Sequence, residues 1–272
     1  MDSPKLEHTV HLRLLNLEYT NICKLPDSLG NLINLQFLLL NGCKSLHILP
    51  KSVTKLNNLR WLQISNTPLN YVPKGIGKLK HLHHVKGLII RNSGDDGEEG
   101  CNLEELQMLE KLSYLFMFIR KAHSLSRVSH LPALKELVVA DCPMMECVEK
   151  LESLQSLMVI DHQVDNTSFL QWLISYLEEP IDNQENNTSF PQWLISFLQQ
   201  REEKPHEDDL FKLYLECSAQ SLKGCLKGRP HWSFIQQVPR FIGYAEHRCM
   251  YMKYTKEPYY YETNIDHWYA NY

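Results

Sequence analysis

Residues 35 to 43 read Leu35-Gln36-Phe37-Leu38-Leu39-Leu40-Asn41-Gly42-Cys43, and the step Leu49-Pro50 follows them. The leucines follow the pattern L-x-x-L-x-L, and a small residue comes three positions after the last of them. The same pattern begins at Leu12 and Leu59, and a related one begins at Leu82. The chain therefore carries an internal repeat of 23 or 24 residues. A fixed period of this size is typical of units that stack side by side.

Within each unit the apolar residues alternate with period two, which predicts a short strand with one buried face. The inward positions are Leu15 and Leu17, Leu38 and Leu40, and Leu62 and Ile64. One unit cannot bury its apolar row alone, so consecutive strands must stack into a parallel sheet. The segments 25–32, 49–56 and 72–79 repeat the same apolar offsets after a proline and return the chain on the opposite side.

These features predict an α/β fold, a leucine-rich-repeat solenoid of horseshoe type. Its parallel sheet lies on the concave face, and short helices or loops lie on the convex face. Cys43 and Thr67 stand where the chain bends after a strand, so we expect their side chains to satisfy backbone groups of the turn. Nearly every leucine of the repeats is then a plain core residue.

The residues between the inward positions point outward onto one shared surface. With their neighbours they form the predicted protein-binding face: Leu14, Asn16, Phe37, Leu39, Arg60, Trp61, Gln63, His84 and Lys86. Phe37, Trp61 and His84 form a predicted column across the strands, and aromatic and arginine side chains are the usual anchors of protein interfaces. Alternatively, Phe37 and Trp61 stack along the sheet only to stiffen it.

The second half of the chain is less regular. An acidic, glycine-rich stretch at 91–100 predicts a surface loop. Strands are expected again at 112–117, 134–142, 154–159 and 210–218. Residues 166–177 recur almost letter for letter at 187–198, a tandem duplication that predicts two short amphipathic helices, one that packs and one that protrudes as an insert. The favoured interpretation of the insert is a duplication that the fold tolerates, and the alternative is a helix that binds a partner.

The predicted domains are the solenoid at 1–222 and an aromatic segment at 223–272. Ten aromatic residues with interleaved Lys and Arg mark the second segment, from Trp232 to Trp268. A solenoid needs a cap over its last coil, so a terminal cap or a partly ordered tail is the favoured interpretation. A surface that binds single-stranded nucleic acid is the other. Acidic residues are mixed into the segment, which favours the cap and a chain without a nucleic-acid partner.

The composition is that of an ordinary globular protein, with 43% hydrophobic residues and a net charge of −4. No secretory leader or membrane span is expected, so the predicted compartment is the cytoplasm or the nucleus, and the Asn-x-Ser/Thr triplets at Asn166, Asn186 and Asn187 are coincidental. The eight cysteines are expected to be reduced, with Cys43, Cys142 and Cys217 on repeat positions.

The short leader before Leu12 is too thin to cap the first coil, so we expect an isolated chain to aggregate or to need a partner.

The sequence carries no motif of a catalytic or cofactor site. It lacks the phosphate-binding G-x-x-x-x-G-K-[ST] and G-x-G-x-x-G loops, the G-x-S-x-G nucleophile turn, and the H-E-x-x-H or paired C-x-x-C zinc patterns. His81, His83 and His84 are close in sequence, but a metal would need a further ligand from another repeat. The sequence therefore predicts a protein that is not an enzyme and holds no metal and no cofactor.

Several segments resemble the leucine-rich-repeat region of plant nucleotide-binding disease-resistance proteins, especially those of the coiled-coil class. They are the segment from Leu25 to Leu38, the bends at Cys43 and Thr67, the segment from Pro73 to Leu79, and the later Leu131-Pro132 and Phe190-Pro191 steps. The resemblance runs from Leu12 to about Ser218. It implies a module that senses a pathogen effector or a guarded host protein. It also implies that the module holds the nucleotide-binding domain of a receptor, in cis or in trans, at rest.

The chain departs from that family because it contains neither the coiled coil nor the nucleotide-binding domain, so nucleotide binding and hydrolysis are not carried over. The alternative function is a free-standing intracellular adaptor that scaffolds signalling proteins.

Overall fold

A computed structural model describes residues 11–90, 100–119, 126–140, 145–160, 192–203, 211–245 and 248–265. The chain divides into two compact units, Met1–Leu154 and Gln155–Tyr272, called unit 1 and unit 2 here. The acidic loop at 91–99, Cys142, the first duplicated helix at 166–177 and the three Asn-x-Ser/Thr triplets lie outside the described residues.

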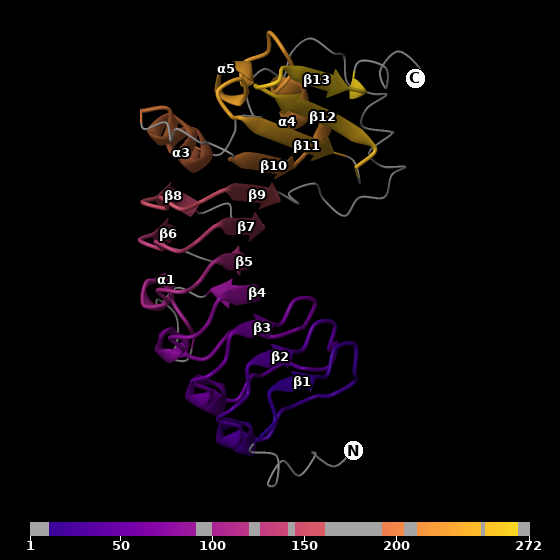
Figure 1. Cartoon of the computed structure of the whole chain (residues 1–272). Helices are drawn as coiled ribbons and strands as arrows, with labels where there is room; N and C mark the ends of the chain where they lie inside the picture. The colour runs from indigo at the N-terminus through magenta and orange to yellow at the C-terminus, as the bar shows by residue number, and fades with distance from the viewer. Residues whose placement is uncertain are drawn as a thin grey trace. The chain divides into compact units, whose positions relative to one another are not determined.

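Unit 1 contains a parallel sheet with the strand order β1-β2-β3-β4-β5-β7 (Figure 1). Its strands are β1 (Leu14–Asn16), β2 (Phe37–Leu39), β3 (Trp61–Gln63), β4 (His84–Ile90), β5 (Tyr114–Ile119) and β7 (Glu136–Ala140). Each begins two residues after the first leucine of its repeat, so the predicted strands of this unit are confirmed. The fold is the predicted leucine-rich-repeat solenoid.

The inward side chains of these strands form one continuous core. Leu38, Leu62, Val85, Leu115 and Leu137 are aligned by the register of the sheet and are at most 1% exposed. Each buried leucine stabilises the stack by about 1.5–3 kcal/mol relative to an exposed one. Leu15 of β1 is half-buried. The repeats therefore share one core, as the period predicted.

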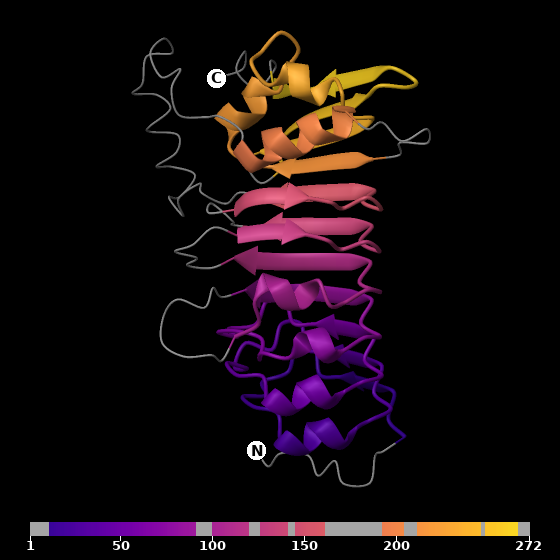
Figure 2. The same cartoon turned by 90° about the vertical axis from the view of Figure 1, so that its left-hand side faces the viewer.

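Short helices return the chain on the other side of the sheet of unit 1 (Figure 2). They are the 3₁₀ helices η1 (Asp27–Asn31), η2 (Lys51–Lys55) and η3 (Ile76–Lys78), and the α-helix α1 (Leu103–Leu106). Pro26 and Pro50 precede the first two, because a residue with fixed φ and no N–H is suited to the start of a helix. In the later repeats two strands, β6 (Ser126–Ser129) and β8 (Met145–Glu149), pair in parallel as a separate small sheet.

The side chains of Thr67 and Cys43 form hydrogen bonds with backbone carbonyls near the turns that follow the strands, as predicted. The Thr67 hydroxyl donates to the Ile64 carbonyl at 2.7 Å, and the Cys43 thiol donates to the Leu17 carbonyl at 3.0 Å. In β4 the chain makes a bulge at Gly87, which has φ = 90°. A Cβ at this position would lie 2.5 Å from the Ser65 nitrogen, so only glycine fits there.

Unit 2 contains a mixed sheet of β9 (Ser156–Ile160), β10 (Lys212–Glu216), β11 (Arg240–Ala245), β12 (Met250–Thr255) and β13 (Tyr260–Thr263). The first three strands are parallel, and the last two continue the sheet as antiparallel neighbours (Figure 1). The sequence predicted β9 and β10 but not β11, which continues the parallel order although it lacks the leucine pattern.

Helices α3 (Gln192–Glu203), α4 (Ala219–Gly224) and α5 (Trp232–Ile235) complete unit 2. Helix α3 contains most of the second duplicated segment, and it buries Trp193, Leu194 and Phe197. Phe241 of β11 and Ile235 of α5 are fully buried together with Leu222 of α4, so part of the aromatic segment, within 223–265, contributes to the core of this unit.

Candidate protein-binding face

The register of the parallel strands brings the first residue of each strand into one row. This row, from β1 to β7, is Leu14, Phe37, Trp61, His84, Tyr114 and Glu136. Neighbouring strands lie about 4.8 Å apart, so planar side chains in such a row can stack on one another. All six side chains stand opposite to the leucine core.

Four rings of the row form a column, called the aromatic column here: Phe37, Trp61, His84 and Tyr114. The Trp61 and His84 rings are stacked with centroids 4.3 Å apart, and the His84 and Tyr114 rings are stacked at 4.1 Å. Phe37 meets Trp61 at 5.9 Å with its plane tilted by 47°. Trp61 stays 39% exposed, which leaves a large aromatic surface open to a partner.

The predicted column is therefore present, and it is one ring longer than predicted. Tyr114 is not among the predicted binding residues, because it follows the acidic stretch at 91–100, after which the repeats are less regular. The signal was nevertheless available: Leu112, Leu115 and Met117 keep the L-x-x-L-x-L spacing, which places Tyr114 in the same row as His84.

The next outward row is Asn16, Leu39, Gln63, Lys86 and Phe116. The Asn41 amide, two residues beyond Leu39, donates to Glu18 Oε1 and, at 2.7 Å, to Gln63 Oε1. The Gln63 amide then lies 3.4 Å from His84 Nε2. A polar ladder therefore runs beside the aromatic column and joins it at His84.

The partners of His84 define its protonation state. The Gln63 amide nitrogen can donate to His84 Nε2 when the proton of the neutral ring lies on Nδ1. Burial of the ring, with a smaller effect of the Lys86 charge, lowers the pKa of His84 from 6.5 to about 4. The column therefore presents a neutral imidazole at physiological pH, and this keeps the stack free of a desolvated charge.

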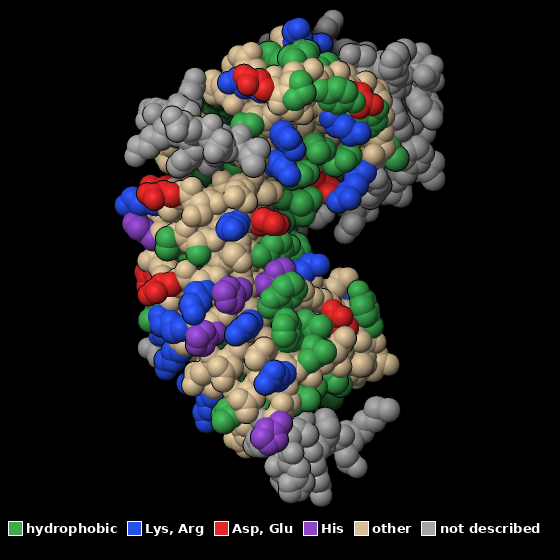
Figure 3. Space-filling model, viewed as in Figure 1, with side chains coloured by type: hydrophobic (Ala, Val, Ile, Leu, Met, Phe, Trp, Pro, Cys, Tyr) green, Lys and Arg blue, Asp and Glu red, His purple; other side chains and the backbone are tan. Residues whose placement is uncertain are grey.

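Cationic groups flank the column on the side where the strands begin. Backbone hydrogen bonds align Arg60 with His83, and Arg60 is exposed. Burial, followed by the charges of Arg60, Lys111 and His81, lowers the pKa of His83. With Lys86 on the other side, the column lies between positive side chains. Figure 3 shows hydrophobic, histidine and basic side chains together on this part of unit 1.

Two predicted residues lie at the end of this face, where β1 begins the described part of the sheet. Leu14 is 50% exposed and Asn16 is exposed, and the register of β1 and β2 pairs Leu14 with Phe37 at the end of the column. The histidines 81, 83 and 84 do not converge: the His81 Nδ1 atom lies 3.3 Å from the Lys111 ammonium, and the His84 ring lies inside the column. The described ranges contain no cluster of three or more His, Cys, Asp or Glu side chains with the arrangement of a metal site.

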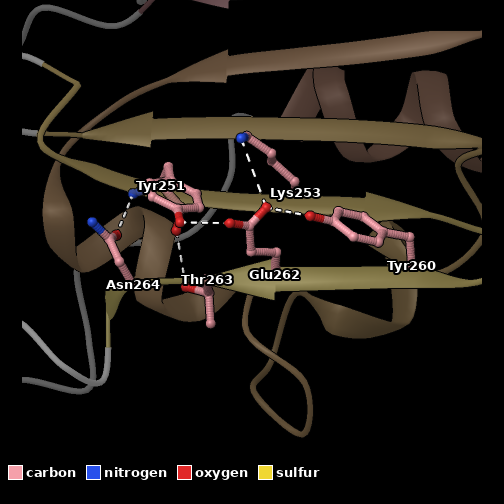
Figure 4. Close-up of polar contacts among 6 residues, drawn as sticks. All are labelled: Tyr251, Lys253, Tyr260, Glu262, Thr263 and Asn264. Carbon is pink, nitrogen blue, oxygen red and sulfur yellow. Dashed lines mark hydrogen bonds and ion pairs between the residues drawn. The ribbon is translucent and has the colours of Figure 1, made fainter.

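Unit 2 carries a separate polar cluster on β12 and β13 (Figure 4). The hydroxyls of Tyr251 and Tyr260 both donate to the Glu262 carboxylate, the first at 2.7 Å, and the Lys253 ammonium lies 3.7 Å from it. These hydrogen bonds, that of Tyr260 first, lower the pKa of Glu262 and raise the pKa of each tyrosine. The cluster ties the two strands together.

A family model described as a leucine-rich repeat region matches residues 1–201. The chain belongs to the leucine-rich repeat family. This membership agrees with the stacked strands of unit 1 and with the aligned leucine core. In the described part of this leucine-rich repeat protein, no helix has the length and apolar character that crossing a bilayer requires.

The similar proteins come from plants. The chain is 31% identical over 84 residues to the putative disease resistance protein At1g58400 of Arabidopsis thaliana, and 27% identical over 199 residues to the putative disease resistance protein At4g19050 of the same plant. It is 27% identical over 140 residues to the probable disease resistance protein RF9, also from Arabidopsis thaliana. The predicted resemblance to the repeat region of plant disease-resistance proteins is therefore confirmed.

These matches cover 31%, 57% and 48% of this leucine-rich repeat chain, and 9%, 16% and 12% of the relatives. The chain therefore spans less than a fifth of the length of these relatives. Among solved structures, a leucine-rich-repeat protein of Leptospira interrogans matches with a TM-score of 0.46 and 20% identity, over 86% of this chain and 56% of that one.

Proposed function

We propose that this leucine-rich repeat chain is a protein-recognition module that binds its partner through the aromatic column of unit 1. The observation that carries the proposal is the open stack of Phe37, Trp61, His84 and Tyr114 between Arg60 and Lys86. Large rigid rings beside cationic side chains contribute most of the free energy at protein interfaces. The proposed role is binding and not catalysis.

The names of the relatives support a role in plant defence. We extend the proposal to a module that recognises a pathogen effector or a guarded host protein in the cytoplasm or nucleus. The same module would hold the nucleotide-binding domain of a receptor in its resting state, in cis or in trans. A free-standing adaptor would use the same face but would need no nucleotide-binding domain, so co-expression with and without such a domain separates the two functions.

The face itself is tested by site-specific photo-crosslinking in plant cells. A photoreactive phenylalanine analogue replaces Gln63, beside the column, and in a second variant it replaces Ile48, which is 58% exposed and lies outside the sheet. We expect a discrete protein adduct from position 63 and none from position 48. Adding Trp61→Ala should remove the adduct.

The melting temperature of the Trp61→Ala variant distinguishes a role of Trp61 in binding from a role in stiffening the sheet. Because Trp61 is 39% exposed, its removal should lower the melting temperature by only a few degrees if its main role is recognition. If Trp61→Ala leaves the adduct intact, or if position 48 gives the same adduct, the aromatic column is not the binding face.

A further inference from the structure

The first four repeats of unit 1 carry a net positive charge, although the whole chain is negatively charged. Residues 11–90 contain ten Lys and Arg but only two Asp and Glu, whereas the complete chain has a net charge of −4. All residues of this segment are described. A net positive charge of this size attracts negatively charged partners to the surface.

Half of these positive charges lie together on the side of the short helices. Lys51 and Lys55 are the first and last residues of η2, and Lys74, Lys78 and Lys80 lie in and around η3. These five exposed side chains are called the lysine patch here. Figure 3 shows Lys and Arg side chains along the side of unit 1 where the short helices lie in Figure 1.

The two helices that carry the lysine patch pack directly on each other. A Cβ on Gly75 would lie 3.5 Å from the Thr54 side chain, so the η3 segment lies against η2 without a gap. Lys51 and Lys74, and likewise Lys55 and Lys78, occupy equivalent positions in two consecutive repeats, so these four lysines lie on the same side of unit 1. Like charges on the same side repel one another, and a partner with negative charge relieves that repulsion.

One acidic group beside the lysine patch, Glu105, is engaged by backbone groups, whereas Glu104 and Glu110 are exposed. Glu105 Oε2 of α1 accepts hydrogen bonds from the backbone N–H groups of Gly75 and Gly77, at 2.6 and 3.3 Å. The Lys80 ammonium donates to the Met108 carbonyl at 2.7 Å. In the described residues, no carboxylate forms an ion pair with a lysine of the patch.

Two exposed apolar side chains border the lysine patch. Met108 is 49% exposed, and its sulfur would lie 3.1 Å from a Cβ on Gly77, so it lies against η3. Ile33 is 57% exposed at the end of η1, and its carbonyl accepts a hydrogen bond from the Asn58 side chain beyond η2. Basic side chains together with exposed apolar ones are typical of surfaces that lie on a bilayer.

We propose that the lysine patch docks unit 1 onto an anionic phospholipid surface, with Ile33 and Met108 in contact with the headgroup region. A protein partner fits less well, since lysine is depleted at protein interfaces in favour of arginine and aromatic residues. A single-stranded nucleic acid also fits less well, since the patch offers no aromatic side chain for base stacking. This surface is distinct from the aromatic column, so the inference goes beyond the proposed function.

The test is co-sedimentation of the 272-residue chain with vesicles of phosphatidylcholine alone or mixed with phosphatidylserine, at low salt. Near an anionic bilayer each lysine changes the binding constant by about fivefold. The variant Lys51→Gln, Lys55→Gln, Lys78→Gln should therefore bind the mixed vesicles about 100-fold more weakly. The matched control Lys44→Gln, Lys227→Gln, Lys256→Gln removes the same charge from exposed sites outside the patch, and its affinity should fall by less than about fivefold.

Near-equal affinity of the wild-type chain for the two kinds of vesicle would overturn the proposal, and so would an equal loss in the two triple variants. The chain could instead bind a single-stranded RNA or an acidic polypeptide more tightly than mixed vesicles, with the same dependence on the three lysines. That result would overturn the proposal and identify the patch as a binding site for that polyanion. Circular dichroism of both variants checks that the fold is kept.

Discussion

The rings of Trp61 and His84 stack almost face to face, with centroids 4.3 Å apart and planes inclined by 9°. The two residues are paired by the parallel register of β3 and β4, so the backbone of the sheet itself sets the contact. His84 stacks on Tyr114 in the same way on its other side. The ring of His84 is therefore the centre of the aromatic column, and its chemistry affects both neighbours.

The first prediction concerns the coupling of these two rings. A double-mutant cycle of Trp61→Ala and His84→Ala, followed by urea unfolding, should give a coupling free energy of about 0.5–1.5 kcal/mol. The cycle Trp61→Ala with Leu14→Ala is the control, because Leu14 lies in the same row but does not touch Trp61. Additive effects in the first cycle would show that the rings are neighbours without mutual stabilisation.

The second prediction is a pH dependence of stability that arises at His84. Its pKa is about 4 in the folded chain and near 6.5 in the unfolded chain, so between these values the unfolded chain binds more protons. The contribution of His84 to the free energy of unfolding should therefore have its full value above pH 6.5 and decrease as the pH drops toward 4. Because the ring is partly exposed, we expect a loss of about 1 kcal/mol.

The control for this pH dependence is His84→Tyr, which keeps a stacked ring but does not titrate in the same window. Urea unfolding at several pH values should give a flatter profile for this variant. His83, whose pKa is also lowered, remains in both proteins, so the difference between the two profiles reports His84 alone. Identical profiles would contradict the assignment of a neutral His84 ring.

Much of unit 1 could be predicted because its core repeats in the sequence. Leu38, Leu62, Val85 and Leu115 occupy the same position in successive units, and this alone sets the strands, their register and the outward row. The same argument placed Phe37, Trp61 and His84 in one column. The predicted column ends at His84, because the acidic stretch at 91–100 interrupts the regular repeats, although the spacing of Leu112, Leu115 and Met117 places Tyr114 in the same row.

Other elements could not be predicted, because their sequence signals are weak. Strands β6 and β8 are followed directly by His130 and Lys150, which have φ of 58° and 54°. A left-handed turn is usually signalled by glycine or asparagine, and here neither residue marks it. Strand β11 contains Phe241 and Ile242 but no leucine row. Beyond it the sheet continues with antiparallel strands, which need no repeat.

The third prediction compares two threonines that make the same kind of hydrogen bond. The hydroxyl of the buried Thr67 donates to the Ile64 carbonyl, and that of Thr54 donates to the Lys51 carbonyl at an exposed site. Thr67→Val leaves a carbonyl of the buried turn with one hydrogen bond fewer, so it should destabilise the chain by about 1–2 kcal/mol. Thr54→Val should cost less than about 0.5 kcal/mol, because water replaces the hydroxyl. Thermal unfolding of both variants measures the difference, and equal effects would count against a structural role for the turn at Thr67.

The last prediction concerns the hairpin of β12 and β13 in unit 2. The hydrogen bond that each hydroxyl donates to the Glu262 carboxylate raises the pKa of Tyr251 and Tyr260, and the negative charge of Glu262 adds to the effect by repelling a tyrosinate. Glu262→Gln keeps an acceptor oxygen but removes the charge. The two tyrosines should therefore ionise at lower pH, and the absorbance of tyrosinate in an alkaline titration should rise earlier than in the wild-type chain. Glu104→Gln removes an equal charge from an exposed site in unit 1 and should leave the titration unchanged. If the Glu262→Gln curve superimposes on the wild-type curve, the charge of the carboxylate does not raise the pKa of these hydroxyls.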